Sequence, residues 1–125
     1  MPSIRTDKQI FPFFDSVNTQ VTAAGTSESF RNNGFSTLIL EVSDATSIKL
    51  TVEGCINILN TNGTTKTDEE CAWTTLAVID MGSYSVADEI SNNGIYAIGI
   101  NGSARVRVVV SEISGSATII GVAEV

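Results

Sequence analysis

The chain of 125 residues has no histidine, one tryptophan, two cysteines and two prolines, and its 14 acidic side chains outnumber 7 basic ones. Without histidine, the Ser–His and Cys–His nucleophile pairs, the HExxH metal site and a histidine pH switch are excluded. The net charge of −7 disfavours nucleic acid as a partner, because duplex binding needs a clustered cationic face. We therefore expect a protein that acts by contact and not by catalysis.

The N-terminus carries no recognisable signal peptide. Residues 1–9, MPSIRTDKQ, are polar and of mixed charge, and they lack the apolar stretch of a signal peptide. No apolar run approaches the roughly 18 residues that a membrane helix needs. We expect synthesis in a cytoplasm without export by the usual signal, no membrane partner, and a flexible arm over residues 1–9.

Alternating β-branched and polar residues, typical of half-buried strands, dominate the rest of the sequence. The alternation is clearest over residues 35–43, 47–54 and 104–111, and it is less strict over 117–125. Weaker strands are expected at residues 10–16, 21–23, 27–31, 72–81, 84–90 and 94–101, separated mostly by Gly and Asn-Gly turns. This spacing predicts an all-β fold, a single-domain antiparallel β-sandwich of jelly-roll type with about eight strands. The domain would span residues 10–125.

Cys55 and Cys71 flank a long polar segment, residues 57–70. The cysteines lie near the end of one expected strand and the start of the next, so a hairpin would place them at bridging distance. A disulfide is therefore one expectation, and two reduced thiols, which synthesis in a cytoplasm favours, are the alternative. The segment between them is too long for a tight turn, and loops of this length are often functional.

Charged side chains do not form a recognisable catalytic or metal site. The acidic runs at 68–70 and 88–89 lack the spacing of an EF-hand loop, and adjacent carboxylates on a strand point to opposite faces. Paired carboxylates for glycoside hydrolysis need no histidine, but nothing in the sequence brings two of them together. Arg105 and Arg107 share one strand face, which we interpret as solvated or as paired with acidic neighbours. No cofactor, metal ligand or catalytic residue is expected.

Aromatic and apolar side chains supply the candidates for contact with a partner. Trp73, Tyr84 and Tyr96 are the residues that would stack on a sugar ring, and packing in or beside the core is the alternative. The apolar cluster at residues 11–14 either begins the core or docks on a partner. The candidates for partner contact in and after the arm are Ile4, Arg5, Ile10, Phe11, Phe13 and Phe14.

Three segments carry a resemblance to a known group of proteins. They are AWTTLAVID at 72–80, GIYAI at 94–98 and ARVRV at 104–108. In these strand patterns, and over roughly residues 35–125, the chain resembles small β-sandwich virion structural proteins of tailed bacteriophages and prophages of Gram-positive bacteria. The loop before Trp73 is longer than the short turn that this pattern leads us to expect, which marks residues 57–70 as particular to this chain.

The resemblance implies a capsid decoration protein or a tail accessory protein. As a decoration protein it would bind the outer surface of the phage head in the virion and stabilise the head by added interface. Its partner would be the major capsid protein, and a homo-oligomer is expected, with a trimer favoured by threefold positions in capsid lattices. The arm would add a strand to an exposed capsid edge. A carbohydrate-binding module of a tail or baseplate, which contacts cell-wall glycans, is the alternative that the sequence leaves open.

Overall fold

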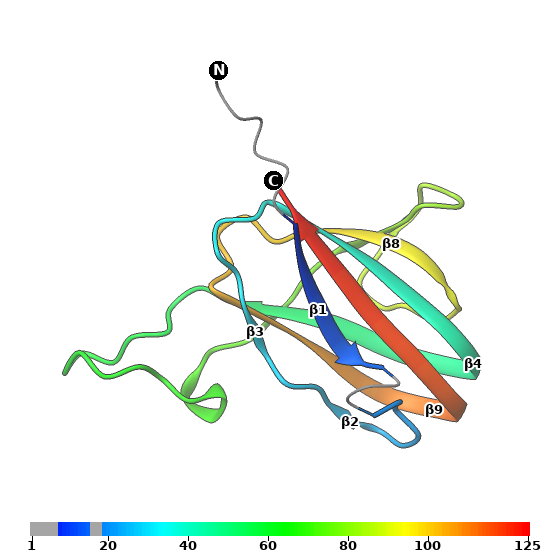
Figure 1. Ribbon diagram of the computed structural model, residues 1–125, viewed down its shortest axis with the longest axis horizontal. Coiled ribbons are helices and arrows are strands. Elements are labelled where there is room, and N and C mark those ends of the chain that lie inside the picture. Colours follow the sequence, from blue (N-terminus) through cyan, green and yellow to red (C-terminus); the bar gives the residue numbers. More distant parts are fainter. Residues whose placement is uncertain (1–7, 16–18) are drawn as a thin grey trace.

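The computed structural model describes residues 8–15 and 19–125, and β-strands account for nearly all of its regular structure (Figure 1). The strands are β1 (Lys8–Phe14), β2 (Gly25–Thr26), β3 (Phe30–Arg31), β4 (Thr37–Cys55), β5 (Thr74–Thr75), β6 (Val78–Asp80), β7 (Val86–Ala87), β8 (Gly94–Gly99) and β9 (Arg105–Glu124). One short 3-10 helix, η1 (Asp68–Glu70), interrupts them. All pairings between the strands are antiparallel, in the order β1-β9-β4-β8-β6-β7, with β2 and β3 beside β9 and β5 beside β4.

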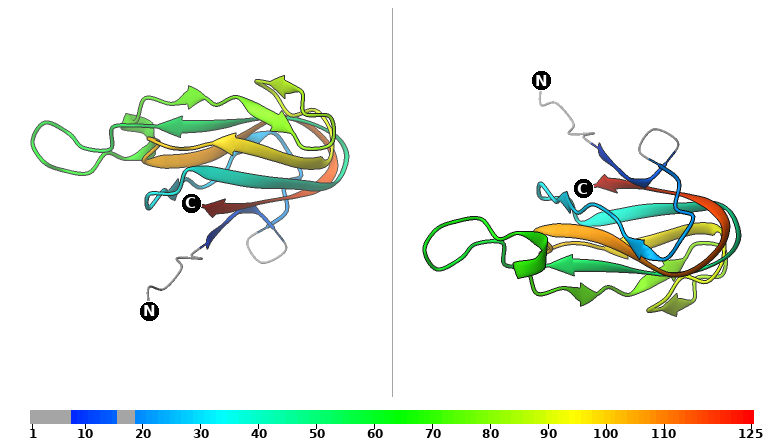
Figure 2. Two further views of the ribbon diagram at one scale, coloured as in Figure 1. Left: turned by 90° about the horizontal axis from the view of Figure 1, so that it is seen from above. Right: turned by 90° about the horizontal axis from the view of Figure 1, so that it is seen from below.

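The two longest strands turn this sheet into a sandwich of two layers (Figure 2). The pairing of β4 with β9 begins where Thr37 lies opposite Glu124 and ends where Cys55 lies opposite Arg105. The register shifts near the middle of this ladder. Asp44, with φ 71°, and Gly115, with φ 81°, lie at these shifts, where the ladder bends. Such bulges let one ladder bend without losing its pairing.

Each half of the long ladder belongs to a different layer. The first layer holds the early part of β4 and the late part of β9 together with β1, β8, β6 and β7. The second layer holds the late part of β4 and the early part of β9 together with β2, β3 and β5. The molecule therefore has one outer sheet face on each layer and a core between them.

The core is made by the apolar positions that alternate along the long strands. Its buried members include Leu38, Leu40, Val42, Ile48, Leu50, Val52, Val106, Val108 and Val110. β1 adds two aromatic side chains to the same cluster, and the ring of Phe11 stacks on that of Phe30 with centroids 5.4 Å apart. The alternation seen in the sequence thus marks the buried face of each clear strand.

The all-β, antiparallel sandwich predicted from the sequence is confirmed, whereas the strand order does not confirm a jelly roll. Several details differ from prediction. The segments 27–31 and 84–90 supply only the two-residue strands β3 and β7, and 72–81 supplies the two short strands β5 and β6. Residues 35–43 and 47–54 form one strand and not two, as do 104–111 and 117–125, because pairing continues through the bend. Residues 21–23 supply only an isolated bridge at Val21. β1 begins at Lys8, inside the predicted arm, and residues 1–7 lie outside the described part of the chain.

A substitution at Gly115 tests how the β4–β9 ladder bends. A Cβ atom at this position would lie 2.9 Å from the Thr46 hydroxyl oxygen, and its positive φ is costly for any other residue. We expect Gly115→Ala to lower the free energy of unfolding by about 2 kcal/mol in urea denaturation. Gly63→Ala is the matched control, because Gly63 has φ +88° with nothing within 4 Å. Equal losses from the two variants would contradict the role assigned to the contact with Thr46.

Candidate interaction face

The outer face of the first layer carries an unbroken row of apolar side chains. Cross-strand partners in antiparallel sheets point to the same side, so the register identifies the row. It runs across all six strands of the layer, one residue from each: Ile10, Val122, Ile39, Ala97, Ile79 and Val86. Five inter-strand spacings of about 4.8 Å make this row roughly 24 Å wide.

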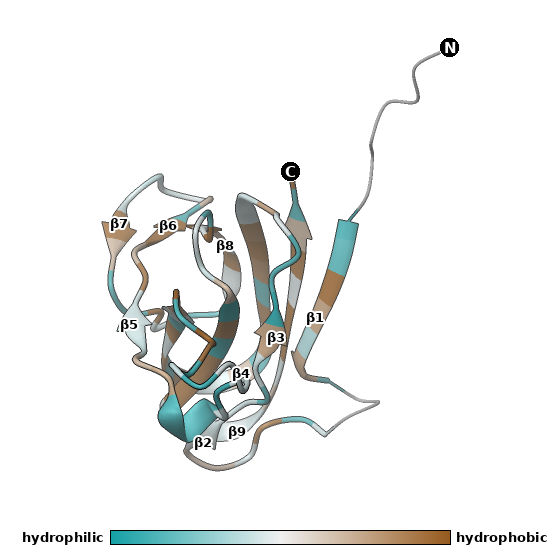
Figure 3. Ribbon diagram, turned by 90° about the vertical axis from the view of Figure 1, so that its left-hand side faces the viewer, coloured by the Kyte–Doolittle hydropathy of each residue, from teal (hydrophilic) through white to brown (hydrophobic). Residues whose placement is uncertain are grey.

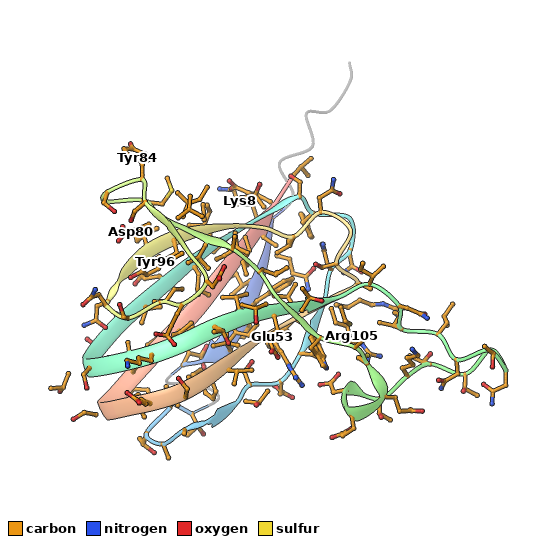
Figure 4. The ribbon with its side chains drawn as sticks, turned by 180° about the vertical axis from the view of Figure 1, so that it is seen from behind. Lys8, Glu53, Asp80, Tyr84, Tyr96 and Arg105 are labelled. Carbon is orange, nitrogen blue, oxygen red and sulfur yellow. The ribbon has the colours of Figure 1, made fainter. Side chains whose placement is uncertain are left out.

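Neighbouring apolar residues extend the row into a patch, which we call the outer face. Ile95 and Ile120 lie two residues along their strands from Ala97 and Val122, on the same side of the sheet. Met81 follows β6, and Tyr84 lies in the adjoining turn at the edge of the layer, as Figure 4 shows. The side chains of Ile10, Ile79, Met81, Tyr84, Val86 and Ile95 are between 40% and 76% exposed. In Figure 3, β6 and β7 appear as hydrophobic segments at this edge.

A shallow hollow lies within the outer face. It has a volume of about 590 Å³ and is lined by Ile39, Asp80, Met81, Gly82, Asn93, Gly94 and Ile95. Monomeric proteins rarely expose contiguous apolar patches of more than a few hundred Å², and larger ones mark sites of interaction. The outer face therefore has the shape and chemistry of a contact surface for another macromolecule.

Charge on the outer face is sparse and mostly negative. Glu41 lies between Ile95 and Ile120 in the register, its side chain is exposed, and no side chain among the described residues pairs with it. At one edge, Lys8 is already paired with Glu124 at 3.4 Å. A partner on this face therefore meets apolar surface with the unpaired Glu41 carboxylate near its middle and the Asp80 carboxylate at the hollow.

A second cluster of functional side chains lies at the base of the long loop, on the side of the second layer that points away from the core (Figure 4). Arg107 Nε donates to Glu53 at 2.8 Å, and its guanidinium lies 4.0 Å from the centre of the Trp73 ring. Arg105 Nη1 is 3.2 Å from a carboxylate oxygen of Asp68, which also accepts from Ser29 Oγ at 2.8 Å. The interpretation of these arginines as a solvated face is therefore wrong, and their acidic partners, Asp68 and Glu53, belong to the same chain.

These contacts fix the loop on the sandwich. The Trp73 indole donates to the backbone carbonyl of Asp68 at 2.9 Å, which holds η1 over the strand ends. Within η1, hydrogen bonds to the Glu70 carboxylate from the backbone amide and hydroxyl of Thr67, the residue before the helix, lower the pKa of Glu70 and cap the helix. From this base the rest of the loop projects away from both layers, as Figures 1 and 2 show.

The three aromatic residues predicted for sugar stacking are not brought together. Tyr96 is buried, its hydroxyl donates to the Asn92 carbonyl at 2.7 Å, and burial followed by the nearby Asp80 carboxylate raises its pKa. Trp73 is half-buried beneath Arg107. Tyr84 is exposed in a turn of the first layer, whereas Trp73 lies beside the second layer. Tyr96 and Trp73 thus pack in or beside the core, which is the alternative to sugar stacking.

The predicted contact residues near the N-terminus divide into distinct groups. Phe11 and Phe13 are buried in the core, so they are not available to a partner while β1 is paired. Phe14 is half-buried against the same cluster. Ile10 points outward as the first member of the apolar row. Ile4 and Arg5 lie outside the described residues.

No metal-ion site is formed in the described part of the chain, where no group of three or more His, Cys, Asp or Glu side chains converges. Within the same residues, no helix is long and apolar enough to cross a membrane.

No protein-family profile and no curated protein matches the chain. Among solved structures, the SPBc2 prophage-derived protein YomS has the same fold, with a TM-score of 0.76 and 20% identity over 98% of this chain and 97% of that chain. The PBSX exported protein XepA matches with a TM-score of 0.76 and 14% identity, over 98% of this chain. The match covers 39% of XepA, so the chain spans about two fifths of its length. These neighbours establish the fold, and both are phage or prophage proteins.

Proposed function

We propose that this chain is a phage virion structural protein that decorates the capsid, attached to the outside of the head through the outer face of its first layer. The observation that carries the proposal is the apolar row across all six strands of that layer. The phage or prophage origin of both structural neighbours and the resemblance of residues 35–125 to virion proteins support it. Attachment at many equivalent sites lets each contact be weak while the head gains stability.

The chemistry of the outer face specifies what the major capsid protein would present. An apolar surface is needed to cover the row, because covering it removes exposed aliphatic side chains from water. A lysine or arginine is needed opposite Glu41, since an unpaired carboxylate buried at an interface costs several kcal/mol, by order of magnitude. A surface with both features would bind this face and discriminate against an acidic one.

A second copy of the chain, related by a two-fold axis through this face, fits less well. The centre of the row lies between β4 and β8, and Glu41 is next to that centre. An axis that passes close to Glu41 would bring two carboxylates together, and each chain also carries a net charge of −7. The expected homo-oligomer, with a trimer favoured, is therefore proposed to form through other surfaces.

Analysis of purified phage particles tests this function. We expect mass spectrometry to find the protein in many copies per particle and to find that it stays with heads after tails are removed. Purified protein added to heads that lack it should sediment with them. Absence from particles, or recovery with tails only, would contradict head decoration. A Trp73 fluorescence titration with cell-wall polysaccharide that saturates would instead support the carbohydrate-binding alternative.

A further inference from the structure

We propose that Cys55 and Cys71 form an oxidisable thiol pair, which a small external disulfide converts into a bridge that closes the long loop at its base. The loop between them, residues 56–70, belongs to the second layer and not to the outer face. The proposal therefore holds or fails independently of the proposed attachment to a capsid.

The fold already places the two thiols together. Cys55 ends β4 and pairs across the ladder with Arg105, so both side chains point to the outer side of the second layer. Cys71 directly follows η1 and packs over this position, where Arg105 Nη1 lies 3.4 Å from its sulfur atom. Cys71 is close enough to Cys55 to contribute to the raised pKa of that thiol, and both cysteines are free and buried. Neither belongs to the main core cluster, so a bridge would not disturb it.

Contacts around the cysteines hold this geometry before any bond forms. Arg105 is fixed by Asp68, and Asp68 is tied to Trp73 through its backbone carbonyl. Cys55 is fixed by the ladder, because its carbonyl accepts a hydrogen bond from the amide of Ala104 at 2.6 Å. A disulfide that forms between positions that are already in place requires little backbone movement, which is the condition for a stabilising bridge.

The two cysteines have different parts in the exchange. Cys71 is at the edge of exposure, with 9% of its surface accessible, and lies beside a guanidinium group. Cys71 loses its proton to solvent, and its thiolate attacks one sulfur of the external disulfide, forming a mixed disulfide and releasing one thiolate. Cys55 then loses its proton to solvent, and its thiolate attacks the Cys71 sulfur and expels the second thiolate. Both released thiolates take up protons, so two protein thiols are oxidised and one small disulfide is reduced.

The second step sets the pH dependence of the bridge. In the reduced protein, burial, followed by the interaction with Cys71, raises the pKa of Cys55 to about 11. Once Cys71 is in the mixed disulfide its contribution is lost, but burial, the largest cause, still keeps the pKa of Cys55 raised. The charged and titratable groups that face it are Cys71 from the loop and Arg105 from β9, with Asp68 of η1 paired to that arginine. Below this pKa the thiolate fraction of Cys55 rises about tenfold for each pH unit. Ring closure should therefore be markedly faster at pH 9 than at pH 7.

Oxidised glutathione and the folded full chain provide the test. We expect the native protein to lose both free thiols together, to lose the mass of two hydrogen atoms, and to retain no glutathione. The bridged form should melt roughly 5 °C or more above the reduced form, because the bridge constrains the unfolded chain. Reducing agent should restore both the thiols and the original melting temperature.

Single variants separate the two steps. Cys55→Ser should trap glutathione on Cys71, whereas Cys71→Ser should leave Cys55 almost unreacted in the folded protein. A stable glutathione adduct in the native sequence, two thiols that stay unreacted at pH 9, or a bridged form that melts lower would overturn the proposal. The measurements on the native sequence decide the question even where a variant folds poorly.

Discussion

Ile79→Glu is expected to abolish measurable attachment to phage heads while leaving the fold intact. Ile79 lies in the apolar row between Ala97 and Val86, and 40% of its surface is exposed in the free chain. A carboxylate at this position stays hydrated in the free protein, so the free energy of unfolding should change by less than about 1 kcal/mol. Attachment would bury that charge without a partner, at roughly 3 kcal/mol, which weakens binding about 100-fold. Sedimentation of labelled protein with heads that lack it measures this loss.

Ile56→Glu is the matched control for this prediction. Ile56 is an isoleucine with 82% exposure, but it lies at the start of the long loop and not on the outer face. The same change of side chain there should leave attachment unchanged. If Ile56→Glu releases the protein from heads and Ile79→Glu does not, the loop makes the contact and the outer face does not.

Gly121→Val is expected to destabilise the sandwich more than Gly115→Ala does. Gly121 lies in β9 where the first layer meets the core, and a Cβ atom would lie 2.6 Å from Leu38 Cδ1 and 3.2 Å from Phe13 Cε2. Both neighbours are buried and have little room to move. Overpacking of this kind costs about 3 kcal/mol, which urea denaturation would record as a lower unfolding midpoint with an unchanged slope.

Gly99→Val is the control, because the same substitution is made in a strand of the same layer. Gly99 ends β8, is exposed, and has nothing within 4 Å of an added Cβ atom. Valine favours extended backbone, so this variant should be neutral or more stable by a few tenths of a kcal/mol. A large loss from Gly99→Val as well would show that strand glycines matter for a reason other than close packing.

Period-two alternation is sufficient to predict the fold class and the core positions of the clear strands. It predicts Leu38, Leu40 and Val42 on one face, and all three are buried. Local sequence also predicts a turn at Ser114-Gly115, because glycine there indicates a reversal. In the structure Gly115 provides a bulge, since β9 stays paired with β4 on both sides of it. Whether a glycine reverses a strand or bends it depends on the partner strand, which local sequence does not specify.

The outer face is not predicted from the sequence, although the sequence contains a signal for it. Ile39 lies between Leu38 and Leu40, and Ile119 is followed by Ile120, so these strands are apolar on both sides. That pattern is typical of strands covered on both faces. The proposed attachment to a capsid would supply this second cover. Residues 117–125 alternate less strictly for this reason, but the register that aligns one apolar residue from each strand comes only from the pairing.

The apolar cluster near the N-terminus left two interpretations open, the start of the core and a docking segment. Three phenylalanines close to a chain end suggest a docking segment, but β1 pairs with β9 and directs Phe11 and Phe13 into the core. Period two then places Ile10 outside, where it begins the apolar row. The contact prediction for Ile10 is therefore retained for a reason that the sequence does not supply, namely its register with Val122.

Hydroxyl-radical footprinting of the protein on and off phage heads tests most directly whether the outer face is the contact surface. Met81 on that face and Tyr84 in the turn at its edge are reactive side chains, 41% and 76% exposed in the free chain. If the outer face is covered on attachment, oxidation of both residues should fall several-fold in the head-bound protein, while oxidation of the exposed Leu59 in the long loop stays the same. Equal oxidation of Met81 and Tyr84 in the two states, with protection of Leu59, would contradict attachment through the outer face.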